Sequence, residues 1–180
     1  MARTAITEER IEVEAVLEEV ASPSDGAVLL FLGVVRNHHE GRQVAGLVYE
    51  AYREMAKETL ERIAREAEKR FATDRMVVLH RVGALDVGEV STVIAVGTPH
   101  REEAYGASRY VIEEIKSRLP IWKRERYVDG GDGWLEGTVP EVEVLERRRG
   151  GKGLPERQSP GIGKDPPGGE NGQGRERGGG

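Results

Sequence analysis

The stretch RMVVLHRVGALDVGEVSTVIAVGTPHREEAYGASRYVIEEIKSRLPIWKRERY, residues 75–127, decides the fold because its hydrophobic pattern changes from extended to helical and back. Two runs rich in β-branched residues predict strands. Apolar side chains then recur at helical spacing, with Thr98 as the expected N-cap and Pro99 in the first turn, until Pro120 ends the helix. The expected elements are strand 75–83, strand 90–97, helix 99–119 and strand 121–128.

The upstream residues add the same two kinds of element. A short N-terminal run predicts an edge strand, and two amphipathic patterns predict helices. The continuous apolar run 27–36 is typical of a buried strand, and the NHHEGRQ segment after it predicts a hairpin with the next strand. The expected elements are strand 3–7, helix 11–21, strand 27–36, strand 44–52 and helix 53–71, with a last strand at 133–137. We therefore predict an α+β fold with a mostly antiparallel or mixed sheet and about three helices.

The last 34 residues, 147–180, differ in composition from the rest of the chain. They hold 12 of the 24 glycines and 4 of the 8 prolines, no aromatic residue, and only Leu154 and Ile162 as large aliphatic side chains. Such a segment buries too little apolar surface to offset the entropy of ordering it. We therefore predict one domain at residues 1–146 and a disordered tail at residues 147–180.

The charge of the predicted domain limits its partners. The chain has a net charge of −5 and the tail contributes +4, which leaves −9 on residues 1–146. An acidic body argues against nucleic acid, because phosphate backbones bind basic faces. No apolar run approaches the roughly 20 residues that cross a bilayer, and the N-terminus lacks the apolar core of a signal peptide. We expect a cytoplasmic protein without membrane contact.

The absence of cysteine limits the chemistry. The chain has no thiolate nucleophile and no cysteine-ligated zinc, so any sulfur involved would come from another molecule. His38, His39 and Glu40 are adjacent, but neighbouring histidines project in different directions and no third spaced ligand follows. We therefore expect no metal site and no bound cofactor.

Several cationic side chains are candidates for anion binding. His100 and Arg101 begin a predicted helix, where free backbone amides and the helix dipole favour a phosphate or carboxylate. The alternative is a solvated first turn. Arg36 follows a predicted strand and carries a bidentate fork suited to phosphate, although an ion pair with a carboxylate is the alternative. His80 and Arg81 are expected to close a strand and to pair with acidic neighbours.

Two lysines seven residues apart flank the predicted helix-to-strand corner LPIW. Lys116 falls beside the apolar face of the helix, and Lys123 follows a tryptophan. A lysine in a partly desolvated position loses basicity and exchanges protons near neutral pH. The alternative is a snorkelling lysine whose stem covers the core while its ammonium stays in water. The pattern alone leaves both interpretations open.

Five segments between residues 26 and 137, taken in order, resemble the catalytic large subunit of molybdopterin synthase. They are GAVLLFLGVVRNHHEG, LVYEAYREMA, HRVGALDVGE, PHREEAYGASRYVIEEIKSRLPIWKRE and GWLEG. The most specific features are the Arg-Asn loop after a strand, the YEAY strand, the His-Arg helix start and the two lysines around PIWK. Each feature alone is common, whereas their combination in this order is specific.

The resemblance implies a hammerhead-type fold and a homodimer of large subunits within a heterotetramer. It implies that a small ubiquitin-like carrier subunit brings sulfur as a C-terminal glycine thiocarboxylate. The sulfur would pass to cyclic pyranopterin monophosphate and form the molybdopterin dithiolene, a sulfurtransferase step of molybdenum cofactor biosynthesis. A chain without cysteine is consistent with this implied role, because sulfur arrives on the partner.

The resemblance also assigns site residues, one position at a time. The corresponding residues here are Lys116 and Lys123 for catalysis, and Phe31, Arg36, His100 and Arg101 for substrate binding. Two positions depart from the family pattern. Pro99 stands where the family has a small non-proline residue, and an arginine that the family takes from the neighbouring subunit has only Arg147 as a loose match.

Two other functions are compatible with the same residues. A non-catalytic subunit would bind a small anion at the helix start, and the lysines would then be redundant. A pure assembly subunit would dock the ubiquitin-like carrier without chemistry. Binding of the carrier without turnover of the pterin would favour the assembly subunit. Binding of a phosphorylated ligand without any need for a carrier would favour the anion-binding subunit.

Overall fold

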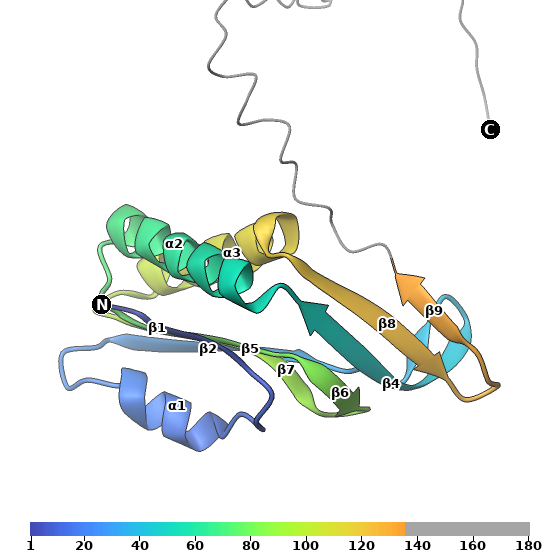
Figure 1. Cartoon of the computed structure of the whole chain (residues 1–180). Coiled ribbons are helices and arrows are strands. Elements are labelled where there is room, and N and C mark those ends of the chain that lie inside the picture. Colours follow the sequence, from blue (N-terminus) through green and yellow to red (C-terminus); the bar gives the residue numbers. More distant parts are fainter. Residues whose placement is uncertain (136–180) are drawn as a thin grey trace, which may run out of the picture. The chain divides into compact units, whose positions relative to one another are not determined.

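The computed structural model describes residues 1–135, which contain three helices and nine strands (Figure 1). In chain order the elements are β1 (Arg3–Thr7), α1 (Val13–Val20), β2 (Ala27–Val34), β3 (His38–His39), β4 (Arg42–Ala51), α2 (Arg53–Phe71), β5 (Arg75–Arg81), β6 (Gly83–Asp86), β7 (Val90–Thr98), α3 (Arg101–Arg118), β8 (Ile121–Tyr127) and β9 (Asp132–Leu135). The predicted α+β class, with three helices and mixed sheets, is confirmed for this part of the chain. The predicted tail, 147–180, lies outside the described residues.

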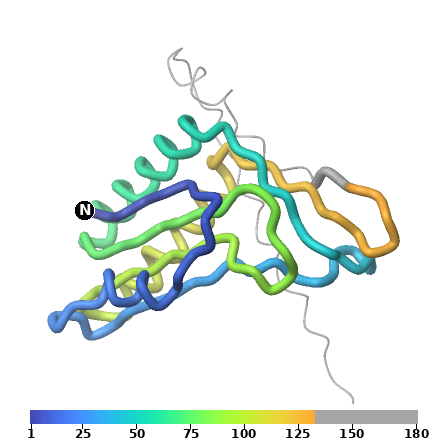
Figure 2. Tube along the Cα trace, turned by 60° about the horizontal axis from the view of Figure 1, so that its bottom comes forward, coloured from blue at the N-terminus to red at the C-terminus, as the bar shows by residue number. Residues whose placement is uncertain are grey.

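A four-stranded sheet in the order β1-β5-β7-β2 forms the centre of the fold. β1 pairs with β5 in parallel, and the β5–β7 and β7–β2 pairs are antiparallel. Figure 2 shows β1, in dark blue, beside β5, in green. The helices α2 and α3 cover one face of this sheet and α1 packs on the other (Figure 1). The sheet is therefore the middle layer of three.

Alternating side chains of the central strands feed two separate apolar cores. On β5, Met76 and Val78 join the core beneath α2 and α3, whereas Val77 and Leu79 join the core beneath α1. This alternation is the period of two expected for a strand with both faces covered. His80 takes the next position after Val78 on the α2 and α3 face.

A five-stranded sheet follows the order β3-β4-β8-β9, with β6 paired to β4. All its pairs are antiparallel. The chain passes from β5 into β6 at Gly83, whose φ of +90° is in the left-handed region that favours glycine. The two sheets therefore meet where β5 ends, which is also where the candidate site lies.

Two details of the sequence prediction are wrong. The run 27–36 does not form a hairpin with β4, because β2 pairs with β7 and β4 belongs to the other sheet. β2 is also an edge strand rather than a buried one, with Val28, Leu32 and Val34 exposed. The chain does reverse at Glu40 and Gly41, but the strand that pairs with β4 across this turn is the short β3, in the other sheet.

The start of α3 also differs from the prediction. The N-cap residue is His100, and Thr98 lies at the end of β7. The Thr98 hydroxyl donates to the His100 carbonyl at 2.7 Å, so it stabilises the turn before the helix rather than capping it. The C-terminal prediction is confirmed, since α3 ends at Arg118 and Leu119 is the C-cap before Pro120. Within residues 1–135, no helix is both long and apolar enough to cross a membrane.

Candidate functional site

A cavity of about 490 Å³ lies where the four-stranded sheet, the end of α3 and the start of β8 meet. Its lining combines apolar side chains with a few polar groups from separate elements. The polar side chains are Tyr49, His80, Ser91, Thr92, Lys116 and Lys123. A concave site with convergent polar groups is the arrangement expected of a small-molecule pocket.

The two lysines reach this cavity from opposite sides of the corner between α3 and β8. Lys116 is in the last turn of α3, and Lys123 is the third residue of β8, opposite Tyr49 of β4. The corner itself is fixed, because Leu119 N–H donates to the Ile115 carbonyl at 3.0 Å and Leu119 is buried. The rigid corner therefore places two lysines in the lining of one cavity.

The environments of the two lysines differ. Lys123 is half-buried, whereas Lys116 is exposed on the surface of this chain. Of the two interpretations that the sequence left open, the exposed position of Lys116 favours a snorkelling lysine in the single chain. Water would leave this ammonium only when another molecule covers it.

One wall of the cavity comes from β2. Phe31 and Gly33 line it together with Ser91 and Thr92 of the neighbouring β7. A Cβ at Gly33 would approach the Thr92 Cβ to 3.2 Å and the Ser91 Oγ to 3.4 Å, and the strand register shifts after Gly33. The Ser91 hydroxyl donates to the Gly33 carbonyl at 3.1 Å. Glycine thus lets the edge strand close tightly against β7 and leaves the space above it open.

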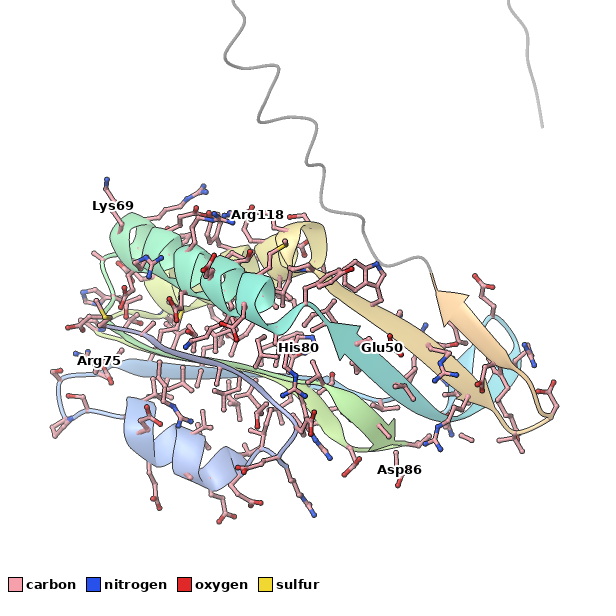
Figure 3. The ribbon with its side chains drawn as sticks, viewed as in Figure 1. Glu50, Lys69, Arg75, His80, Asp86 and Arg118 are labelled. Atoms are coloured by element: carbon pink, nitrogen blue, oxygen red, sulfur yellow. The ribbon has the colours of Figure 1, made fainter. Side chains whose placement is uncertain are left out.

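The polar floor of the cavity was not predicted from the sequence. His80, labelled in Figure 3, is buried and pairs in register with Thr92. Its ring lies 5.3 Å from that of Tyr49 in an edge-on contact. Burial lowers the pKa of His80 to about 4 and raises the pKa of Tyr49. The expected pairing with acidic neighbours is wrong for His80, whose Nδ1 contacts the Arg81 carbonyl at 2.9 Å. It holds for Arg81, which pairs with Glu89.

A signal for His80 was present in the sequence. Met76, Val78 and His80 alternate along one face of the strand, so the histidine continues a row of core side chains. A titratable side chain on an inward row is more informative than one at a loop tip, because burial perturbs its chemistry.

The structure does not bring the other predicted residues into this cavity. Arg36 is exposed, two residues after Val34 of the cavity wall, and it forms no ion pair within residues 1–135. His100 and Arg101 are exposed at the first turn of α3. The axial rise of a helix separates Arg101 from Lys116 by about 22 Å. Of the six predicted residues, Phe31, Lys116 and Lys123 share the cavity.

Comparison with known proteins identifies the family. The family model described as MoaE protein matches residues 6–118. The chain belongs to the MoaE family. The molybdopterin synthase catalytic subunit of Halalkalibacterium halodurans is 44% identical over 143 residues, covering 77% of this chain and 92% of the relative. That of Bacillus subtilis is 41% identical over 135 residues, covering 75% and 85%.

A solved structure shares both sequence and fold with this MoaE chain. The X-ray structure of molybdopterin synthase from Staphylococcus aureus matches with a TM-score of 0.69 and 37% identity, covering 73% of this chain and 96% of the other. The resemblance drawn from five sequence segments is thereby confirmed. The MoaE family model includes Lys116 and ends before Lys123, so membership does not depend on the second lysine.

The remaining histidines of this MoaE chain have structural partners. His39 Nδ1 lies 3.0 Å from Glu125 Oε2, and the buried Glu125 also accepts from the Tyr127 hydroxyl at 2.9 Å. His38 Nδ1 lies 2.9 Å from Asn37 Oδ1. Within the described part of the chain, no three His, Asp or Glu side chains gather as metal ligands.

Proposed function

We propose that this chain is the catalytic subunit of a molybdopterin synthase and acts as a sulfurtransferase. In this role it takes sulfur from the C-terminal thiocarboxylate of a small ubiquitin-like carrier subunit. The acceptor is cyclic pyranopterin monophosphate, and two transfers form the molybdopterin dithiolene. The observation that carries the proposal is the convergence of Lys116, Lys123 and Phe31 on one cavity in a MoaE protein.

The lysines supply the chemistry in this proposal. The Lys116 ammonium protonates the leaving oxygen, or stabilises negative charge as sulfur adds to the pterin side chain. Lys123 adds positive charge on the opposite wall of the cavity. No cysteine is available in the chain, so the sulfur nucleophile belongs to the carrier.

A second cavity supports separate places for the two reactants. It has a volume of about 650 Å³, runs between β2 and the outer side of α3, and shares Phe31, Ile112 and Lys116 with the first cavity. Lys116 therefore stands between two spaces. We assign the carrier tail to the cavity along β2 and α3, and the pterin to the cavity with the polar floor.

In this proposal, His100 and Arg101 act at the cavity of a second copy of the chain. His100 and Arg101 lie at the opposite end of α3 from Lys116, so they do not reach the cavity of their own chain. In a homodimer, the helix start of one copy would bind the phosphate in the cavity of the other. Arg36, near the cavity wall, would bind the same anion from within the chain. Residues 1–146 would form the working domain.

A complementation experiment tests this use of two copies. The Lys116→Ala and Arg101→Ala variants are each expected to lose turnover. Refolding them together should restore turnover, because a mixed dimer contains one cavity with both residues intact. Sites built within a single copy would give no restoration.

The direct test of the function uses a thiocarboxylated carrier and cyclic pyranopterin monophosphate, with the dithiolene pterin as the measured product. We expect product with the carrier and negligible product with free sulfide alone. Robust turnover with sulfide alone would contradict the carrier-dependent mechanism. Carrier binding without turnover would favour an assembly subunit, and carrier-independent binding of the pterin without product would favour an anion-binding protein.

A further inference from the structure

The floor of the first cavity contains a histidine that the proposed chemistry leaves unused. His80 is 6% exposed and lies on β5, between the apolar core under α2 and α3 and the five-stranded sheet. It belongs to the same cavity lining as Lys116 and Lys123. A core position with this neighbourhood would ordinarily be apolar, as the preceding Met76 and Val78 are.

The contacts of His80 determine which nitrogen carries the proton. Its Nδ1 lies 2.9 Å from the Arg81 carbonyl oxygen, which only accepts hydrogen bonds. Nδ1 therefore donates. Burial lowers the pKa of the ring to about 4, so the histidine is neutral near pH 7, and no group within residues 1–135 donates a hydrogen bond to its Nε2. The edge-on contact with Tyr49 restricts rotation of the ring.

The other polar side chains of the cavity behave differently. Lys116 and Lys123 only donate hydrogen bonds, and the hydroxyls of Tyr49, Ser91 and Thr92 both donate and accept. A pterin ring system carries several N–H groups and needs acceptors when it leaves water. His80 is the side chain of this lining that offers a fixed acceptor without a competing proton.

We propose that His80 is a further substrate-binding residue, whose Nε2 accepts a hydrogen bond from an N–H or O–H group of the pterin ring system. This inference rests on the proposed function, because it takes the pterin as the occupant of the cavity. It gives His80 a role in orienting the ring so that the reacting side chain faces Lys116. Loss of the acceptor would weaken binding more than it slows the chemical step.

Two amide substitutions distinguish the roles of the two His80 nitrogens. In His80→Asn, the amide N–H reproduces the Nδ1 donor to Arg81 and the Nε2 acceptor is lost. In His80→Gln, the amide oxygen reaches the position of Nε2 and keeps an acceptor. A purely structural histidine depends on the contact with Arg81, so it would tolerate Asn at least as well as Gln. A substrate-binding histidine tolerates Gln better.

The experiment measures KM for cyclic pyranopterin monophosphate and kcat at saturating thiocarboxylated carrier, with melting temperatures for each variant. We expect His80→Asn to raise KM about tenfold with kcat within a few-fold, as loss of one buried hydrogen bond predicts. His80→Gln should keep KM within about threefold by the same reasoning. His38→Asn, at an exposed histidine away from the cavity lining, is the matched control and should leave KM unchanged.

Three results would overturn the inference. They are an unchanged KM in His80→Asn, a larger KM increase in His80→Gln than in His80→Asn, and, if His80→Asn does not fold, a tenfold KM increase in His80→Gln. Failure of the proposed function is a separate result, because wild-type protein would then make no dithiolene. In that case calorimetric titration of the pterin into wild type and His80→Asn tests the binding role directly, and equal affinities would overturn it.

Discussion

The two sheets of this protein differ in how they are stabilised. The four-stranded sheet is covered on both faces, and its two cores contain 13 and 7 buried apolar residues. The five-stranded sheet has a core of four, Val35, Val44, Leu47 and Leu85, and carries surface ion pairs such as Arg126–Asp86. The candidate site lies where they meet, with His80 from the first sheet, and Tyr49 and Lys123 from the second.

This difference in packing indicates how each sheet positions the residues of the site. A well-packed sheet fixes the floor of the cavity, because core side chains have few alternative positions. The second sheet contributes strand β8, whose start carries Lys123 beside the end of α3. Substitutions in the first sheet should therefore change stability, and substitutions at the junction should change activity.

The largest effect on stability is expected in the core beneath α2 and α3. Ile63 is 0% exposed and belongs to the largest core cluster. Replacing it with alanine should lower the free energy of unfolding by about 4 kcal/mol, since the change removes buried methyl groups and leaves a cavity. Urea unfolding at neutral pH measures this. A loss below about 1 kcal/mol would show that the core is less tightly packed than described.

The buried His80 of the four-stranded sheet predicts that the free energy of unfolding depends on pH. Its pKa is about 4 in the folded protein and 6.5 ordinarily, so the unfolded chain binds the proton first as pH falls. The contribution of His80 to the free energy of unfolding is greatest above pH 6.5. It falls between pH 6.5 and 4, by about 2 kcal/mol from pH 7 to pH 5. His80→Gln should remove this component. Equal pH profiles for the two proteins in urea unfolding would contradict the assignment.

The surface of the second sheet should contribute far less. Asp86 pairs with Arg126 at 3.1 Å, but the Asp86 side chain is 81% exposed. Asp86→Asn should change the free energy of unfolding by less than about 0.5 kcal/mol, because solvent screens exposed pairs. A change comparable to that of Ile63→Ala would mean that ion pairs stabilise the five-stranded sheet as strongly as packing stabilises the other.

The smallest effect is expected from removing the tail. Residues 147–180 have a composition that cannot build a core. A chain ending at Arg147 should keep the oligomeric state of the full chain and melt within about 2 °C of it. Calorimetry and light scattering would test this, and a drop of several degrees would indicate that the tail docks on the domain.

The elements of the fold were predictable because their signals are local. The helical spacing of residues 53–71 and the proline after Leu119 predicted α2 and the end of α3. The partner of β2 was not predictable in the same way. Its neighbour is β7, about 60 residues later, and no local pattern distinguishes that pairing from a hairpin with β4.

The residues of the site were likewise predicted only in part. Lys116 and Lys123 line one cavity, as the family resemblance implied. His80 and Tyr49 were overlooked because their functional value depends on burial and on contact between two sheets. His100 and Arg101 remain predictions, since a helix start identifies an anion-binding end without showing which cavity it faces.

The central claim, that Lys116 acts in proton transfer at this cavity, is tested most directly by single-turnover kinetics of Lys116→Arg at saturating thiocarboxylated carrier. Arginine keeps the charge and a similar apolar stem but does not release its proton near pH 7. We predict a folded protein that binds the carrier and loses at least about a hundredfold in rate. Lys123→Arg should lose less, and Lys57→Arg, at an exposed lysine on α2, should lose nothing. A Lys116→Arg rate within a few-fold of wild type would contradict the account and leave Lys116 as a surface lysine.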